Sequence, residues 1–109
     1  MNRDPDKITE RLIERGESWA DLDAAASALE ETRKSVLAER MQDHASEAKS
    51  MAEREMKALA DQTYKDFVTG MVEDRRKANR ARVRFDAMKI WVELLRSHEA
   101  TRRAEASIR

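Results

Sequence analysis

The chain has 109 residues, of which 40% are charged, 5% are aromatic, two are glycine, one is proline and none is cysteine. This length suits one small domain. The scarcity of glycine and proline argues against a β-rich fold and against an α/β nucleotide-binding fold, because both need frequent turns. Ala, Glu, Arg, Lys and Leu supply 59 of the 109 residues, which is typical of long helices and coiled coils. The sequence therefore predicts an all-α protein.

The 22 basic and 22 acidic side chains cancel, but they are unevenly distributed along the chain. Residues 1–72 carry a net charge of −5 and residues 73–109 a net charge of +5. The absence of cysteine excludes disulfides and thiolate metal sites. No apolar run approaches the ~18 residues of a membrane span, and the first residues lack the apolar stretch of a signal peptide. We expect a soluble, cytoplasmic protein.

Residues 1–17 predict a short N-terminal helix. Asp4 before Pro5 is a good helix start, since a short acceptor side chain can cap free amides and proline is tolerated at the first helical position. One side of this helix would be lined by Ile8, Leu12 and Ile13. The helix is expected to end near Gly16.

Residues 18–60 predict a second, much longer helix. Ser18 and Asp21 have the spacing of a capping box at its start. Apolar or small residues then recur at steps of three and four, which is helical periodicity; they are Leu22, Ala26, Leu29, Val36, Leu37, Met41, His44, Ala48, Met51, Ala52, Met56 and Leu59. The pattern breaks at residues 60–63, where we expect a turn.

Residues 64–107 predict a third helix, preceded by a capping box formed by Thr63 and Asp66. Its apolar seam repeats every seven residues and comprises Tyr64, Phe67, Met71, Asp74, Ala78, Ala81, Phe85, Met88, Val92, Leu95, Glu99, Arg102 and Ala106. Gly70 interrupts it at a cost of roughly 1 kcal/mol relative to Ala. The seam is most apolar between Ala78 and Leu95.

Two arms of nearly equal length joined by a short turn predict a long antiparallel two-helix hairpin. Folding about residues 60–63 would bring Leu29 to Leu95 and Val36 to Met88. In the middle, Ala45 and Ala48 would face Ala78 and Ala81. The acidic arm would then meet the basic one, although each exposed ion pair contributes only ~0–1 kcal/mol. Pairing of the same arms between chains is an alternative assembly.

The stretch Ile90–Leu95 predicts a protein interface. Its apolar side chains surround the helix, so one partner helix cannot cover them all. A two-helix hairpin is also too thin to bury a large core. We therefore expect a dimer or higher oligomer, with Trp19, Ile90, Trp91 and Leu94 as interface residues.

Six cations fall within ten residues, namely Arg75, Arg76, Lys77, Arg80, Arg82 and Arg84. Those at four-residue spacing form one stripe on a helix, and such a stripe can follow a phosphate backbone. The candidate nucleic-acid contacts are Arg76, Lys77, Arg80 and Arg84. The alternative is a solvated face that complements Glu39, Asp43 and Glu47 on the other arm.

No catalytic, metal or cofactor site is expected. His44 and His98 are the only imidazoles, and neither belongs to the helical motif of a di-iron or zinc site. The carboxylate pairs fall on faces expected to be exposed, with nothing to perturb their pKa values. We therefore expect no enzymatic activity.

Parts of residues 50–105, notably Ala58–Tyr64, Asn79–Lys89 and Glu99–Glu105, resemble small helical proteins encoded by bacteriophages and prophages. The resemblance implies a phage-related accessory protein. We expect it to act in the host cytoplasm by binding other proteins, and to modulate or inhibit host defence or recombination machinery. Two alternatives stay open. One is a nucleic-acid-binding recombination accessory, and the other is a structural coiled-coil spacer.

Overall fold

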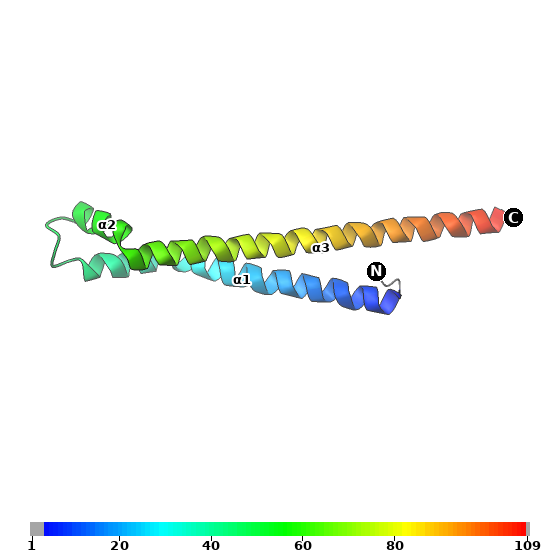
Figure 1. Ribbon diagram of the computed structural model, residues 1–109, viewed down its shortest axis with the longest axis horizontal. Coiled ribbons are helices and arrows are strands. Elements are labelled where there is room, and N and C mark those ends of the chain that lie inside the picture. Colours follow the sequence, from blue (N-terminus) through cyan, green and yellow to red (C-terminus); the bar gives the residue numbers. More distant parts are fainter. Residues whose placement is uncertain (1–3, 109) are drawn as a thin grey trace. The chain divides into compact units, whose positions relative to one another are not determined.

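The computed structural model describes residues 4–108, which form three α-helices (Figure 1). Helix α1 spans Pro5–Asp43, α2 spans Met51–Ala60 and α3 spans Gln62–Ile108. The expected all-α class is confirmed. The chain divides into two compact units. The central unit is Leu22–Ala78, and the terminal unit combines the chain up to Asp21 with the chain from Asn79 onward.

Helix α1 begins where the sequence predicts. The Asp4 Oδ1 atom accepts a hydrogen bond from the Asp6 amide at 3.0 Å, and the Asp4 carbonyl accepts the first intrahelical bond, from Ile8, at 2.9 Å. Pro5 takes the first helical position, where its missing amide hydrogen costs nothing.

The expected break between residues 1–17 and 18–60 is wrong, because α1 runs unbroken through Gly16 and Ser18. A seam with seven-residue period crosses this region, and its members are buried or half-buried: Ile8, Leu12, Arg15, Trp19, Leu22, Ala26 and Leu29. Gly16 sits where the helix meets an aromatic ring. A Cβ atom placed on it would lie 3.2 Å from two carbons of Phe85. Gly16 therefore gives room for packing and does not end the helix.

The expected helix over residues 18–60 is also wrong, because it is interrupted by residues 44–50. Continued past Arg40, the seven-residue pattern of α1 meets only polar side chains, namely Asp43, Glu47, Ser50, Arg54 and Lys57. The apolar residues after Met41 fall on another face of the extended pattern. A straight helix would thus carry polar residues on its packing side, and α1 ends at Asp43.

Helix α2 is a separate short helix with its own cap. The Ser50 hydroxyl accepts a hydrogen bond from the Glu53 amide at 3.2 Å, while the Glu53 carboxylate accepts one from the Lys49 amide at 3.1 Å. The predicted turn near residues 60–63 is present as a single non-helical residue, Asp61. Its Oδ1 atom accepts from the Thr63 amide at 2.7 Å, so Asp61 caps α3 in place of the expected Thr63.

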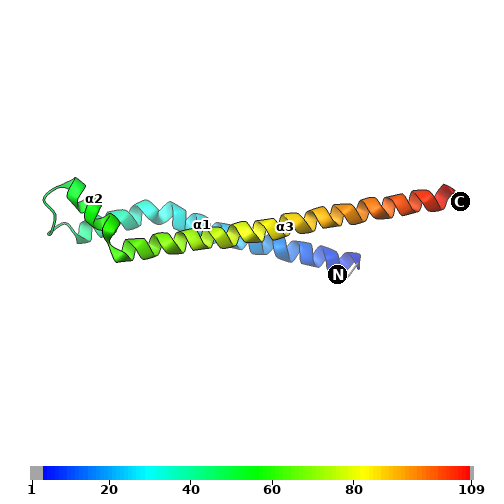
Figure 2. The same cartoon turned by 45° about the horizontal axis from the view of Figure 1, so that its top comes forward.

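In the central unit, α1 and α3 lie side by side and run antiparallel, a hairpin-like arrangement with α2 in the connection (Figures 1 and 2). The order of the contacts shows the direction: Asp23 and Glu30 reach Arg75, whereas Arg40 reaches Asp61. The expected register, with Val36 beside Met88, is wrong. It placed the connection at residues 60–63, whereas the connection between the long helices occupies residues 44–61.

In the terminal unit, the contact between the first part of α1 and α3 is aromatic. The Trp19 and Phe85 rings stack with centroids 5.9 Å apart and an interplanar angle of 28°. The Lys89 ammonium lies 4.7 Å from the centroid of the Phe85 ring, within the range of a cation–π contact. Gly16 lies beneath the same ring.

The core is thin, as expected for a pair of helices. Among the described residues the buried apolar side chains are Ala26, Ala58, Tyr64, Ala78 and Met88. The predicted seam of α3 is buried or half-buried at every position from Tyr64 to Leu95, and exposed at Glu99, Arg102 and Ala106. Met51, Met56 and Leu59, predicted as seam residues, are exposed on α2.

Candidate functional site

A stripe of exposed residues, mainly aliphatic in its first half and small or polar in its second, runs along α3 in the terminal unit. It begins with Val83, Ile90 and Leu94, whose exposed fractions are 62%, 62% and 64%. The steps of four and three continue through residues that are all exposed. We call this set the outer seam, and it comprises Val83, Ala87, Ile90, Leu94, Ser97, Thr101, Ala104 and Ile108.

The outer seam lies on the face of α3 that turns away from α1. Residues at steps of three and four share one face of a helix, and the inner set, including Met88, Val92 and Leu95, is buried or half-buried. The inner set therefore marks the side that packs against α1. Helix α3 thus carries two apolar seams over residues 83–95, of which its own chain covers one.

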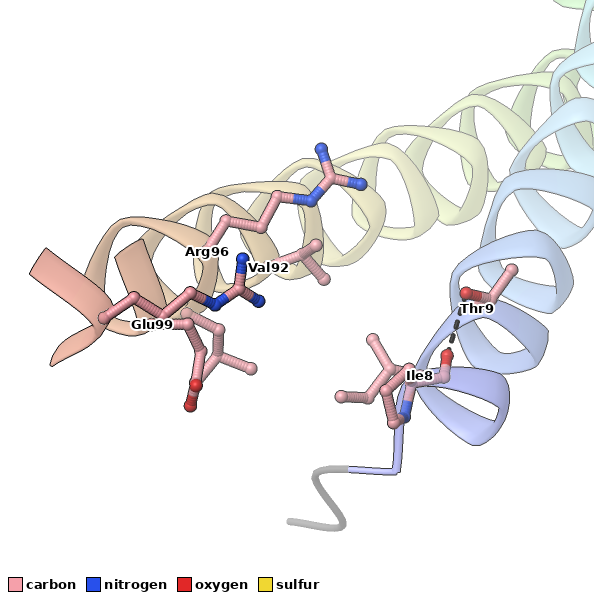
Figure 3. A pocket seen from close by; sticks show the side chains of 8 residues that line it. Ile8, Thr9, Val92, Arg96 and Glu99 are labelled. Atoms are coloured by element: carbon pink, nitrogen blue, oxygen red, sulfur yellow. Dashed lines mark hydrogen bonds between the residues drawn. The ribbon is translucent and has the colours of Figure 1, made fainter. Parts of the chain in front are cut away.

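A groove of about 420 Å³ lies between the start of α1 and α3 (Figure 3). Ile8 extends from α1 toward α3, while Val92, Arg96 and Glu99 come from α3. Pro5, Thr9, Leu95 and Arg103 complete the lining. The lining contains both basic and acidic side chains beside apolar ones, so the groove has no single charge to select a small ligand.

The aromatic residues predicted for the interface are less exposed than the aliphatic ones. Trp19 is half-buried against Phe85 of the same chain, and Trp91 is half-buried at the edge between the inner and outer seams. Ile90 and Leu94 are exposed on the outer seam. The structure thus brings Ile90, Trp91 and Leu94 together on α3 and places Trp19 in the internal stack.

Arg75 is the main ionic contact between α1 and α3 in the central unit. Its guanidinium donates to Asp23 Oδ1 at 2.6 Å and to both Glu30 oxygens at 2.8 and 2.9 Å. The Ser27 hydroxyl accepts a further bond at 3.1 Å. Hydrogen bonds to Glu30 and Asp23 raise the pKa of Arg75, and the bond from Arg75 lowers the pKa of Glu30. This cation therefore stabilises the pairing of the two helices.

A second polar cluster surrounds Asp61, whose side chain is only 8% exposed. Its Oδ2 atom accepts from Arg40 Nη2 at 2.6 Å and contacts His44 Nε2 at 2.8 Å. These bonds lower the pKa of the Asp61 carboxyl. Hydrogen bonds to Asp61 and Glu47 raise the pKa of His44. The cluster ties the end of α1 to the start of α3.

The candidate nucleic-acid contacts are all exposed. Arg76 and Lys77 lie in the central unit, where Arg76 pairs with Glu73 at 3.2 Å. Arg80 and Arg84 lie in the terminal unit and make no ion pair with any described residue. Asp43, expected to face these cations, pairs instead with Arg40 at 2.6 Å.

Residues 4–108 contain no group of three or more His, Asp or Glu side chains placed to hold a metal ion. His98 is exposed on α3.

Helices of the described part lack the combination of length and apolarity that crossing a bilayer requires.

Val83 and the second half of the outer seam lie outside the interface that the sequence predicts, which is confined to the excess apolar residues between Ile90 and Leu95. The missed signal is a second seven-residue period, offset from the first and running to Ile108. It is weak in sequence because Ser97, Thr101 and Ala104 are small or polar members of it.

The chain matches no protein-family model, no curated protein and no solved structure. Its function is therefore inferred from the surfaces described above.

Proposed function

We propose that this protein is a non-enzymatic accessory protein that acts by binding another protein chain through the outer seam of α3. The observation that carries the proposal is the line of large aliphatic side chains, Val83, Ile90 and Leu94, each more than 60% exposed on one helix face. Single exposed apolar residues are ordinary, whereas a continuous apolar surface marks an interaction site.

The energy available from this surface is substantial. Full burial of a Val, Ile or Leu side chain stabilises by ~1.5–3 kcal/mol relative to full exposure. Because about three fifths of each side chain is still exposed, covering Val83, Ile90 and Leu94 would contribute roughly 1–2 kcal/mol apiece. A partner helix that covers the whole seam would gain this free energy of burial at each of the three positions.

The resemblance to phage-encoded helical proteins supports an accessory role of the phage type. Host defence or recombination machinery is then the class of partner to test. Protein binding needs only a stable surface, and in the terminal unit the stacked Trp19 and Phe85 rings pack the first part of α1 against the other face of α3.

The test compares capture of partner proteins by three immobilised chains. They are the wild type, the double variant Ile90→Gln with Leu94→Gln, and the control Val72→Gln. Val72 is a 50% exposed aliphatic residue on α3 outside the outer seam. The wild type and the control should retain the same proteins from host lysate, and the double variant should lose them. Identical retention by all three chains, both of host proteins and of an added second copy of this chain, would refute the proposal.

A nucleic-acid-binding recombination accessory is the second candidate. It is favoured by the candidate contacts Arg80 and Arg84, which lie four residues apart on α3, are exposed and have no ion-pair partner within residues 4–108. Fluorescence anisotropy with single- and double-stranded oligonucleotides should then show binding that weakens steeply with salt, and the double variant Arg80→Gln with Arg84→Gln should weaken it. Absence of binding at ~50 mM salt would remove this candidate. A chain that binds neither protein nor nucleic acid would be a structural helical spacer.

A further inference from the structure

The outer seam has the length and period of a complete coiled-coil strand. Its positions alternate by four and three from Val83 to Ile108 without a break, and every one is exposed. A seam that repeats every seven residues is matched by another helix with the same repeat. The occupant that fits this face is therefore a helix of comparable length, which a compact globular surface does not provide.

We infer that the occupant is a second copy of this chain, and that the two α3 helices pair antiparallel over residues 83–108. This inference rests on the proposed function, since it names the partner for the same surface. Antiparallel pairing with full overlap leaves no seam position without a partner. The facing pairs are Val83 with the partner's Ile108, Ala87 with the partner's Ala104, Ile90 with the partner's Thr101, and Leu94 with the partner's Ser97.

The size pattern of the seam favours this direction. The large aliphatic residues lie in its first half and the small or polar ones in its second half, apart from Ile108. Antiparallel pairing sets Ile90 and Leu94 against small side chains, which lets the layers interdigitate. Parallel pairing would stack Ser97 on Ser97 and Thr101 on Thr101. The Thr101 hydroxyl already donates to the Ser97 carbonyl of its own helix at 3.0 Å, so covering it leaves no unsatisfied donor.

The charges beside the seam favour the same direction. In an antiparallel pair, each flank meets the same flank of the partner. On one flank Arg84 then meets the partner's Glu105, and by symmetry this pair occurs twice. On the other flank Asp86 and Glu93 meet the partner's Ser107 and the partner's Ala100, so the two acids do not face each other. Parallel pairing would leave Glu105 opposite the partner's Ala100, without its cation.

Stoichiometry and direction can both be measured. Sedimentation velocity at micromolar concentration should give twice the chain mass of 12.6 kDa. The double variant Ile90→Asp with Leu94→Asp should give the monomer mass, and the control Val72→Asp the dimer mass. Circular dichroism should show the same helicity in all three chains. A wild-type monomer, or a double variant that stays dimeric, would overturn the inference.

Because the chain contains no native cysteine, disulfide crosslinking between introduced cysteines can report whether the two α3 helices pair antiparallel or parallel. In this pairing Ala87 faces the partner's Ala104. Oxidation of either variant alone, Ala87→Cys or Ala104→Cys, should therefore give no crosslinked dimer. Oxidation of a mixture of the two variants should give a disulfide between them. In this pairing the two Ala87 positions lie roughly 25 Å apart along the helix axis, beyond the reach of a disulfide. Crosslinking of either variant with itself would instead show parallel pairing. Arg84→Glu should weaken the dimer, and adding Glu105→Arg should restore it.

Failure of the inference is distinguishable from failure of the proposed function. If the wild type is monomeric but the substitutions at Ile90 and Leu94 still abolish capture of another protein, the inference is overturned and the proposed function stands. If the chain is monomeric and the same substitutions change no binding at all, both are overturned.

Discussion

The two glycines of this chain provide a matched test of the helix packing, because both lie inside long helices but in different surroundings. Gly70 is exposed on α3, and a Cβ atom added there would meet nothing within 4 Å. Neither glycine has a positive φ, so alanine fits both backbones. Gly70→Ala should therefore stabilise the protein by about 1 kcal/mol, the difference in helix propensity between the two residues.

Gly16→Ala has the same propensity gain and an opposing steric cost. The added Cβ atom would lie 3.2 Å from Cε1 and Cζ of Phe85, and that ring is also held by Trp19 and Lys89. Extra atoms in a packed contact cost typically ~1–3 kcal/mol. We expect Gly16→Ala to be at least about 1 kcal/mol less favourable than Gly70→Ala.

The assay is equilibrium urea unfolding of the wild type and both variants, followed by circular dichroism at constant protein concentration. Gly70→Ala should raise the unfolding midpoint without changing the slope, whereas Gly16→Ala should leave it unchanged or lower it. Equal gains for the two variants would refute the close contact between Gly16 and Phe85. No gain for Gly70→Ala would refute an exposed, regular α3 at that position.

Three further predictions concern the core and the two polar clusters. Met88→Ala should destabilise by ~2–5 kcal/mol, because Met88 is only 4% exposed; a loss below about 1 kcal/mol in urea unfolding would contradict its burial. Arg75→Met should lower the Tm. High salt should reduce the Tm difference between this variant and the wild type, because the ion pairs of Arg75 are partly exposed. A Tm difference that grows with salt would contradict an ionic origin of the stabilisation. Because contact with Asp61 raises the pKa of His44, its stabilising contribution is fully present below about pH 6.5 and is lost as the pH rises through the raised value. The Tm advantage of the wild type over His44→Gln should therefore shrink between about pH 5.5 and pH 9, and an advantage that grows over this range would contradict the His44–Asp61 pairing.

Much of the local structure could be predicted from short-range signals. The cap formed by Asp4 and Pro5 acts within the first turn of α1, so it is visible in sequence. The inner seam of α3 from Tyr64 to Leu95 was also predicted, because its seven-residue period is carried by large apolar residues. The break predicted at Gly16 is wrong, although the sequence contains evidence against it. The seven-residue pattern of α1 continues without interruption from Ile8 to Leu29, across Gly16.

The candidate site was only partly predictable. Ile90 and Leu94 were identified as excess apolar residues because one partner helix cannot cover every side of α3. Trp19 was assigned to the same surface, but whether an aromatic ring faces inward depends on what lies across from it. Here the Trp19 ring stacks on the Phe85 ring, which also lies close to Gly16. The residues next to Trp19 in the sequence do not indicate this contact.

The helical character of this chain and the position of α3 can be predicted from local sequence, because composition, caps and periodicity act between residues a few positions apart. The register of α1 against α3 and the length of the connection between them follow only from the folded structure. Both depend on long-range partners such as Arg75 with Glu30 and Arg40 with Asp61. Geometry alone separates the inner seam from the outer one, because both have the same period and only the position of α1 determines which side is covered.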